Sequence, residues 1–278
     1  MSWFFLALVG HLANAGAFVI DKMLLAKAWK HSATYAALVG LLSVLALLAF
    51  PWVKLWPRGQ DLFLSCLFGG VFVLAVWAFF EALRRAEAGR IVPIVGSLIP
   101  IFTLIGTSIW LGERFTLRIS LGFACLLCAT FLLARSTKND SLDSSTVCVS
   151  VLSALLFAVA SVVGKAAYLQ TDFLGILVTS RVAAALVGIG IFLFVRGARE
   201  EGKALFISRP SKREAKPPFV LMVFGQTLGA LGFLSVNAAL ARGSAALVNA
   251  LQAVQYAAIV FVAWFGGGFF QKILHQFY

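Results

Sequence analysis

The sequence predicts an all-α polytopic membrane protein, and three observations lead to this fold class. Hydrophobic residues make up 61% of the 278-residue chain and charged residues only 12%, a balance that soluble domains of this length do not have. Apolar stretches close to the roughly 20 residues that cross a bilayer recur along the chain. Alternating strand patterns are absent, so every spanning element is expected to be a helix.

Nine apolar stretches are long enough to be spans. No Lys or Arg precedes residue 22 and no small-residue cleavage pattern follows, which favours a retained first helix over a signal peptide. The connections are short and leave no room for a soluble domain. The spans are expected at residues 3–21, 33–51, 62–83, 91–111, 117–134, 147–168, 173–195, 218–240 and 244–265.

The net charge of +12 resides in the connections rather than on one face, so it indicates topology. The lipid bilayer is therefore an expected partner, and nucleic acid is not. Of the 23 Lys and Arg residues, 16 fall on the side that receives the end of the first span, six on the other side, and Arg181 within a span. The positive-inside rule then places the N-terminus outside the cell.

The first span carries His11 and Asn14 one turn apart, and Lys22 closes it. A polar side chain at membrane depth faces protein or a water-filled cavity. His11 is therefore a candidate for proton coupling, with a structural hydrogen bond as the alternative. Both residues are candidates for a substrate cavity.

The fourth span, within "AGRIVPIVGSLIPIFTLIGTSIWLGE", contains Pro93 and Pro100, with Gly96 and Ser97 between them. Each proline deletes a backbone donor and presses on the preceding turn. Lipid penalises every unpaired backbone group. We expect this span to be distorted, with freed carbonyls, and these four residues, lining a cavity. The alternative is that the prolines only shape packing.

The two halves of the chain share an internal pattern. Placing Lys22 on Lys165 gives an offset of 143 residues, and placing Ala82 on Ala239 gives an offset of 157. A longer loop that begins at residue 196 explains the difference. Five spans per half is an odd number, so the two copies would lie inverted in the membrane, as in many secondary transporters.

The segment "EALRRAEAGRIVPIVGSLIPIFTLIGTSIWLGERF" and, in the second half, "NAALARGSAALVNALQAVQYA" resemble the EamA type of the drug/metabolite transporter superfamily. The resemblance covers nearly the whole chain and is strongest at residues 79–122, which include Leu111-Gly112-Glu113. It implies ten helices in two five-helix repeats around a central substrate cavity, and a cytoplasmic N-terminus. Members move metabolites, amino acids, nucleotide sugars or lipid-linked groups.

The end of the chain departs from the family pattern. Gly266-Gly267-Gly268 stands where a second Gly-Glu is expected, and residues 266–278 are too short to span. Their apolar spacing is typical of an amphipathic interfacial helix. We therefore expect a first repeat at 1–137 with five spans and a truncated second repeat at 147–278 with four spans and a tail.

The family alignment of the fourth span on the ninth places Pro93, Gly96 and Pro100 over Asn249, Gln252 and Tyr256, an offset of 156 residues. Both triplets have the i, i+3, i+7 spacing of one helix face. We expect the second triplet to line the cavity opposite the first, although amides also join membrane helices as structural contacts. The eighth span adds Gln226 and Asn237, and its Gly225 and Gly229 form a GxxxG pattern that favours close helix approach.

Arg181 lies about eight residues into the seventh span, and the span from Phe173 to Val195 contains no Asp or Glu. An Arg in a span costs about 2.5–3.5 kcal/mol on insertion scales, so it is expected to have a partner or a function. Two interpretations stay open: binding of an anionic substrate, or a structural role such as bonding to carbonyls freed by Pro93 or Pro100.

These patterns predict a secondary transporter of a small metabolite that works by alternating access in a cell membrane, in particular a bacterial inner membrane. The sequence shows no phosphate-binding loop, no nucleophile elbow and no partner ligands for the Cys125 and Cys128 pair, so we expect no enzyme activity, cofactor or metal. A lipid-carrier flippase and an integral-membrane enzyme acting on a lipid are the alternatives. The sequence does not predict an oligomeric state.

Overall fold

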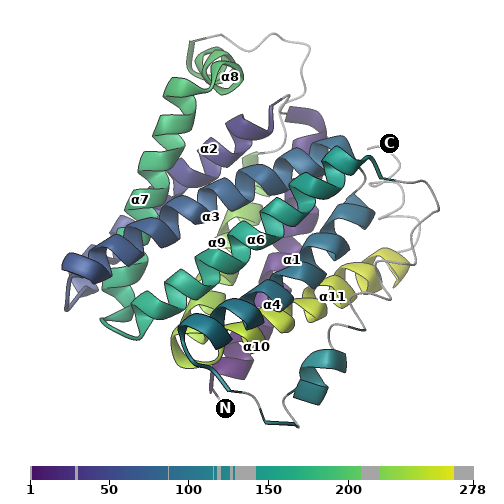
Figure 1. Cartoon of the computed structure of the whole chain (residues 1–278). Helices are drawn as coiled ribbons and strands as arrows, with labels where there is room; N and C mark the ends of the chain where they lie inside the picture. The colour runs from purple at the N-terminus through teal and green to yellow at the C-terminus, as the bar shows by residue number, and fades with distance from the viewer. Residues whose placement is uncertain are drawn as a thin grey trace.

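A computed structural model describes residues 2–28, 31–86, 88–114, 116–117, 120–125, 128, 142–207 and 219–265. These residues form a bundle of helices without strands (Figure 1). The elements are α1 (Ser2–Ala28), α2 (Ser32–Leu42), the 3₁₀ helix η1 (Ser43–Trp52), α3 (Gly59–Arg85), α4 (Ala88–Trp110), α6 (Ser144–Tyr168), α7 (Phe173–Phe194), α8 (Arg196–Ile207), α9 (Phe219–Arg242), α10 (Ala245–Ala250) and α11 (Gln252–Phe265).

Seven stretches within the described residues are long and apolar enough to cross a membrane, and they match predicted spans one to four and six to eight. The all-α polytopic membrane fold is therefore confirmed. The predicted fifth span, 117–134, and the predicted interfacial tail, 266–278, lie largely or wholly outside the described residues. The ninth corresponds to α10 and α11, and its apolar part, Ala245–Ile259, is shorter than a span. The total of nine stays a prediction.

The bundle has two ends, which we name by the elements that mark them. At the N-terminal end, α1 begins near the turn between α9 and α10, where Trp3 packs against Gly243. At the opposite end, the α8 end, α2 begins beside α8 (Figure 1). The polar cavity described below lies between these ends.

Helices from the two halves of the chain are interleaved. The most extensive contacts join α1 to α9 and α3 to α6, and α2 packs on α7. Small residues allow the backbones to approach closely: a Cβ on Gly69 of α3 would overlap the Ser180 carbonyl of α7. The GxxxG pattern of α9 faces α1, because a Cβ on Gly225 would lie 2.6 Å from Ile20 Cγ2. A side chain at either glycine would force these pairs apart.

The sequence predicts a loop from residue 196, but residues 196–207 form helix α8, so this prediction was wrong. Ala198 is fully buried against α2 and α7, which gives the short helix an apolar contact despite its charge. Glu201 accepts hydrogen bonds from the Thr34 hydroxyl (2.6 Å) and the His31 backbone N–H (3.3 Å). On the exposed face, the hydrogen bond from Arg196 to Glu200 holds the pKa of that carboxyl below its ordinary value.

Candidate functional site

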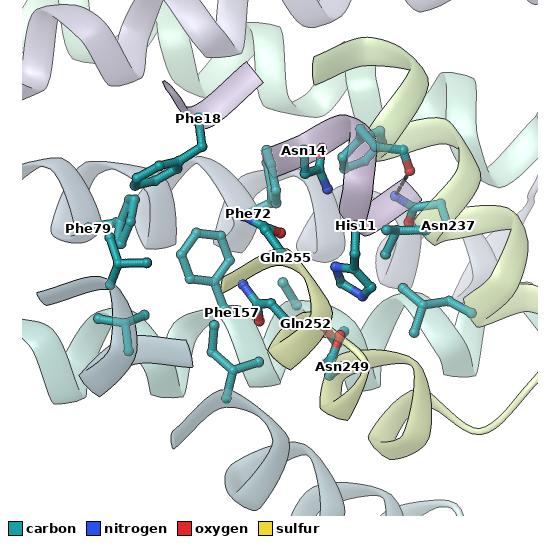
Figure 2. Close-up of a pocket in the computed structure, with 18 of the residues that line it drawn as sticks. His11, Asn14, Phe18, Phe72, Phe79, Phe157, Asn237, Asn249, Gln252 and Gln255 are labelled. Atoms are coloured by element: carbon teal, nitrogen blue, oxygen red, sulfur yellow. Dashed lines mark hydrogen bonds between the residues drawn. The ribbon is translucent and has the colours of Figure 1, made fainter. Parts of the chain in front are cut away.

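A cavity of about 190 Å³ lies within the bundle and is lined by residues of α1, α3, α4, α6, α9, α10 and α11 (Figure 2). None of the described residues that line it is Asp, Glu, Lys or Arg. Neutral hydrogen-bonding groups and rings of this kind suit a small organic molecule. Six of the candidate residues line it: His11, Asn14, Asn237, Asn249, Gln252 and Tyr256.

His11 reaches from α1 to the point where the predicted ninth span is broken. Its Nε2 lies 2.9 Å from the carbonyl oxygen of Val248 in α10, and the side chain is only 4% exposed. A carbonyl only accepts, so in the neutral ring the proton is assigned to Nε2 and the lone pair to Nδ1. Among the described residues none lies within hydrogen-bond geometry of Nδ1, and Gln255 lies beside the ring. His11 therefore presents an unused acceptor.

The helix break lies in the ninth predicted span and not in the fourth. Helix α4 continues through both Pro93 and Pro100, whereas the helix from Ala245 is interrupted at Leu251. The prolines therefore do not interrupt the fourth span, and a distortion of the continuous helix stays a prediction.

The cavity face of α4 is formed by Val92, Val95 and Ile99. This stripe has the same i, i+3, i+7 spacing as Pro93, Gly96 and Pro100, displaced by one residue and so turned by about 100° around the helix. Pro93, Gly96 and Pro100 are buried, and Ser97 donates to the Ile94 carbonyl at 3.0 Å. The four α4 candidates therefore lie beside the lining rather than in it.

Gly96 has a specific role in shaping the wall. A Cβ at this position would overlap the hydroxyl and the ring of Tyr256 on α11. Tyr256 is buried and lines the cavity. The absence of a side chain on α4 therefore lets the ring of α11 lie directly on the α4 backbone, which fixes where the cavity wall stands.

Two asparagines fasten the polar end of the cavity. Asn249 donates to the Thr103 hydroxyl on α4 at 2.9 Å. Asn237 accepts from the Tyr168 hydroxyl at 3.1 Å and donates to the Phe233 carbonyl at 2.8 Å. Each amide therefore joins helices as well as lining the cavity, and both interpretations of these residues are compatible with the geometry.

Arg181 lies outside the lining, in a cage of three aromatic rings. Its guanidinium carbon is 4.2 Å from the ring centroid of Phe233, 4.6 Å from that of Phe72 and 5.3 Å from that of Phe68. The side chain is 4% exposed, and its Nε and Nη2 have no hydrogen-bond partner among the described residues. These rings belong to α3 and α9, so the cage does not involve the α4 prolines.

The same three rings line the cavity, so Arg181 contacts residues of the cavity lining without being part of it. Gln226, the remaining candidate, is partly exposed on α9 and is not among the lining residues. Sequence reasoning missed Gln255 and Ser161, which do line the cavity. Gln255 lies one turn beyond Gln252, and that spacing was the available signal.

The profile of the EamA-like transporter family matches residues 1–135. Residues 1–135 belong to the EamA-like transporter family. The resemblance inferred from the Leu-Gly-Glu segment is thereby confirmed for residues 1–135, and the seven apolar helices make the chain a multi-pass membrane protein. Members of this family are transporters and not enzymes.

A solved crystal structure shares this fold, with a TM-score of 0.64 over 94% of this chain and 89% of the other chain. The two sequences are 17% identical, so the likeness concerns the fold alone. No curated protein sequence matches the chain.

The Leu-Gly-Glu segment of this EamA-like half closes the N-terminal end of the bundle. Gly112 has a φ of 64°, the left-handed conformation that ends many helices, and the Glu113 N–H returns to the Thr107 carbonyl. The Glu113 carboxylate accepts from the Ser244 hydroxyl at 2.6 Å and interacts electrostatically with Lys165. Lys165, which closes its span, is buried. The EamA-like half is thus tied to the second half here.

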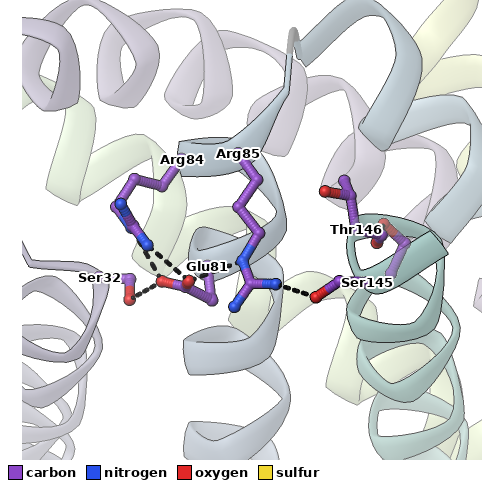
Figure 3. Close-up of polar contacts among 7 residues, drawn as sticks. Ser32, Glu81, Arg84, Arg85, Ser145 and Thr146 are labelled. Carbon is purple, nitrogen blue, oxygen red and sulfur yellow. Dashed lines mark hydrogen bonds and ion pairs between the residues drawn. The ribbon is translucent and has the colours of Figure 1, made fainter. Parts of the chain in front are cut away.

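A second polar cluster lies at the α8 end (Figure 3). Glu81 accepts from the Ser32 hydroxyl at 2.7 Å and forms ion pairs with Arg84 and Arg85, both at 2.8 Å. Arg85 also donates to the Ser145 hydroxyl at 2.5 Å. The cluster therefore joins α2 and α3 of the EamA-like half to α6 of the second half.

Proposed function

We propose that the chain is a secondary transporter that moves a small metabolite by alternating access around the cavity between its two halves. The observation that carries the proposal is the cavity itself, because α1, α3 and α4 line it from one half and α6, α9, α10 and α11 from the other. Rocking one half against the other would expose such a site to either side in turn.

The packing supports an inverted pair of repeats, the first at 1–137 with five spans and the second at 147–278 with four spans and a tail. Helix α1 packs on α9, and α6, which would be its counterpart in the second repeat, packs on α3. In the same way α1 contacts α10 and α11, while α6 contacts α4. Exchanging the two halves turns each of these contacts into its counterpart, as a two-fold relationship in the membrane plane requires.

Both ends of the bundle carry polar contacts between the halves, and at the α8 end these include the hydrogen bond from Thr34 to Glu201 described above. Glu113 meets Ser244 at the N-terminal end, and Arg85 meets Ser145 at the α8 end. Alternating access requires that these contacts break in turn, so that the cavity opens to one side at a time. Contacts with hydroxyl groups suit this role, because water replaces them at small cost.

Reconstituted protein in proteoliposomes tests the function with a panel of amino acids, nucleotide sugars and polyprenyl phosphates. We expect saturable movement of one class, lowered at least tenfold by Gln252→Ala, with Gln226→Ala as the control outside the lining. Movement of polyprenyl phosphates alone would favour lipid flipping. Covalent turnover of a lipid without movement of any member would favour an enzyme and would refute transport. Location in a bacterial inner membrane stays a prediction.

A further inference from the structure

The cavity has an apolar end and a polar end. Phe18, Phe79 and Phe157 gather at one end, with ring centroids 5.8 Å apart for Phe18 and Phe79 and 6.2 Å apart for Phe79 and Phe157. His11 and Asn237 lie at the other end, and Figure 2 shows the two groups on opposite sides of the space. A molecule that fills this space has an apolar or aromatic body and one polar head.

The charge beside the cavity is positive, and no ion pair of Arg181 is found among the described residues. Arg181 shares the Phe72 and Phe233 rings with the cavity wall, and no carboxylate is found among the described lining residues. The ring faces stabilise a guanidinium, but they add no negative charge. In a site of low dielectric, the field of this cation reaches across one ring into the cavity. An anionic head is therefore attracted and a cationic head repelled.

Among the described residues that line the cavity, His11 is the one whose side-chain type has an ordinary pKa close to neutral pH. The other described polar residues that line the cavity are uncharged: Asn14 on α1, Ser161 on α6, Asn237 on α9, Asn249 on α10, and Gln252, Gln255 and Tyr256 on α11. Beyond them lie the Tyr168 hydroxyl of α6, bonded to Asn237, and the Arg181 cation of α7. A proton on Nδ1 would thus form a second cation, with no acid among the described lining residues to offset it. A bound anion would remove that penalty.

We propose that the cargo is an organic anion with an aromatic or apolar body and that it binds together with a proton taken up by His11. The proposal rests on the transport function proposed above and names its substrate class and coupling ion. The proton comes from water on the open side and bonds to the Nδ1 lone pair, while Nε2–H keeps its bond to the Val248 carbonyl. The anion head accepts from Nδ1–H in the field of Arg181.

Linkage makes the coupling reciprocal: the proton raises the affinity for the anion by the factor by which the anion raises the affinity for the proton. Three probes of similar shape separate the head groups, namely benzenesulfonate, benzenesulfonamide and benzylammonium. Benzenesulfonate stays anionic across the pH range used, so any change in its binding with pH belongs to the protein. Calorimetry on the purified chain at pH 5.5, 6.5 and 7.5 measures each dissociation constant.

We expect benzenesulfonate to bind at least tenfold more tightly than benzenesulfonamide, and benzylammonium to bind more weakly than both. The affinity for benzenesulfonate should rise as the pH falls. The rise is at most about tenfold per pH unit, which is the limit for one linked proton. His11→Gln keeps a donor for the Val248 carbonyl but cannot take up a proton, so this variant should bind the anion without the pH dependence. His31→Gln, at the α8 end, is the matched control and should keep the slope.

Several results would overturn the proposal. Tighter binding of benzylammonium or benzenesulfonamide, or no binding of any probe, would exclude the anionic class while leaving transport of another cargo intact. An unchanged pH slope in a folded His11→Gln variant would exclude His11 as the proton site. Failure of the whole proteoliposome panel would instead concern the transport function, so the two failures are distinguishable.

Discussion

At the scale of single residues, Arg181 is the side chain whose role depends most on its surroundings. Three rings surround a cation that has unused donors, which fits both a structural anchor and a source of positive field. Arg181→Lys keeps the charge but loses the planar stacking group. If the field matters, Lys should keep benzenesulfonate affinity within about tenfold, and Gln should lose more with the protein still folded.

Two quantities are measured for each Arg181 variant: the yield of monodisperse protein and the affinity for benzenesulfonate. Equal loss of folded protein in the Lys and Gln variants would make Arg181 a structural residue and remove it from the site. Each cation–π contact stabilises by about 0.5–2 kcal/mol, so some loss in Gln is expected on packing grounds alone.

Gly96 offers a sharper test of the cavity wall. Gly96→Ala would drive a methyl group into the Tyr256 ring, and overpacking of this kind costs about 1–3 kcal/mol. Thermal unfolding in detergent should show the loss, and Tyr256→Leu should reduce it when the two changes are combined. Gly190→Ala on α7 is the control, because no atom lies within 4 Å of its would-be Cβ. Equal effects at Gly96 and Gly190 would contradict the contact.

At the scale of elements, the end of α4 depends on one backbone conformation. Gly112 has a φ of 64°, where an L side chain costs about 1–2 kcal/mol. Gly112→Ala should therefore lower the unfolding temperature and weaken the bond between Glu113 and Ser244. Gly122→Ala, which has open space and no positive φ, should be close to neutral. An unchanged unfolding temperature in Gly112→Ala would show that the chain does not need this helix ending.

At the scale of the whole molecule, alternating access predicts that locking either end stops transport. In a background where the four exposed cysteines are replaced by serine, the pair Glu113→Cys and Ser244→Cys should crosslink at the N-terminal end. At the α8 end, a short bifunctional reagent should crosslink the pair Arg85→Cys and Ser145→Cys. With a disulfide at the N-terminal end and a bis-methanethiosulfonate bridge at the α8 end, each crosslink should abolish transport until a thiol reductant cleaves it.

The control crosslink joins Ser32→Cys to Glu81→Cys, which contact each other within the first half. Rigid motion of that half leaves this contact intact, so transport should continue. Transport that survives both crosslinks between the halves would contradict alternating access.

Orientation is a second property of the whole molecule. In the predicted topology, 16 of the 23 basic residues fall on the side of the membrane where the α8 end lies. Seven of these 16 come from residues 196–217. The positive-inside rule therefore places α8 in the cytoplasm, opposite to the orientation that the family resemblance implies. Lys203→Cys on the exposed face of α8 reports this directly. An impermeant thiol reagent should leave it unmodified in intact cells, and modification would reverse the orientation.

The sequence by itself determined that this chain is a membrane-spanning helical protein and which helices carry polar residues. Insertion of a helix into the membrane depends on its own apolar length, which is a local property, so the seven spans can be predicted from the sequence. The EamA-like segment is likewise recognised from its sequence alone. The tertiary structure decided which face of each helix looks into the cavity. In the folded chain Val92, Val95 and Ile99, and not the prolines, line the cavity. The helix is interrupted at Leu251, and Arg181 packs against aromatic rings outside the lining. These outcomes depend on contacts between residues far apart in the chain, where packing fixes the rotation and shape of each helix.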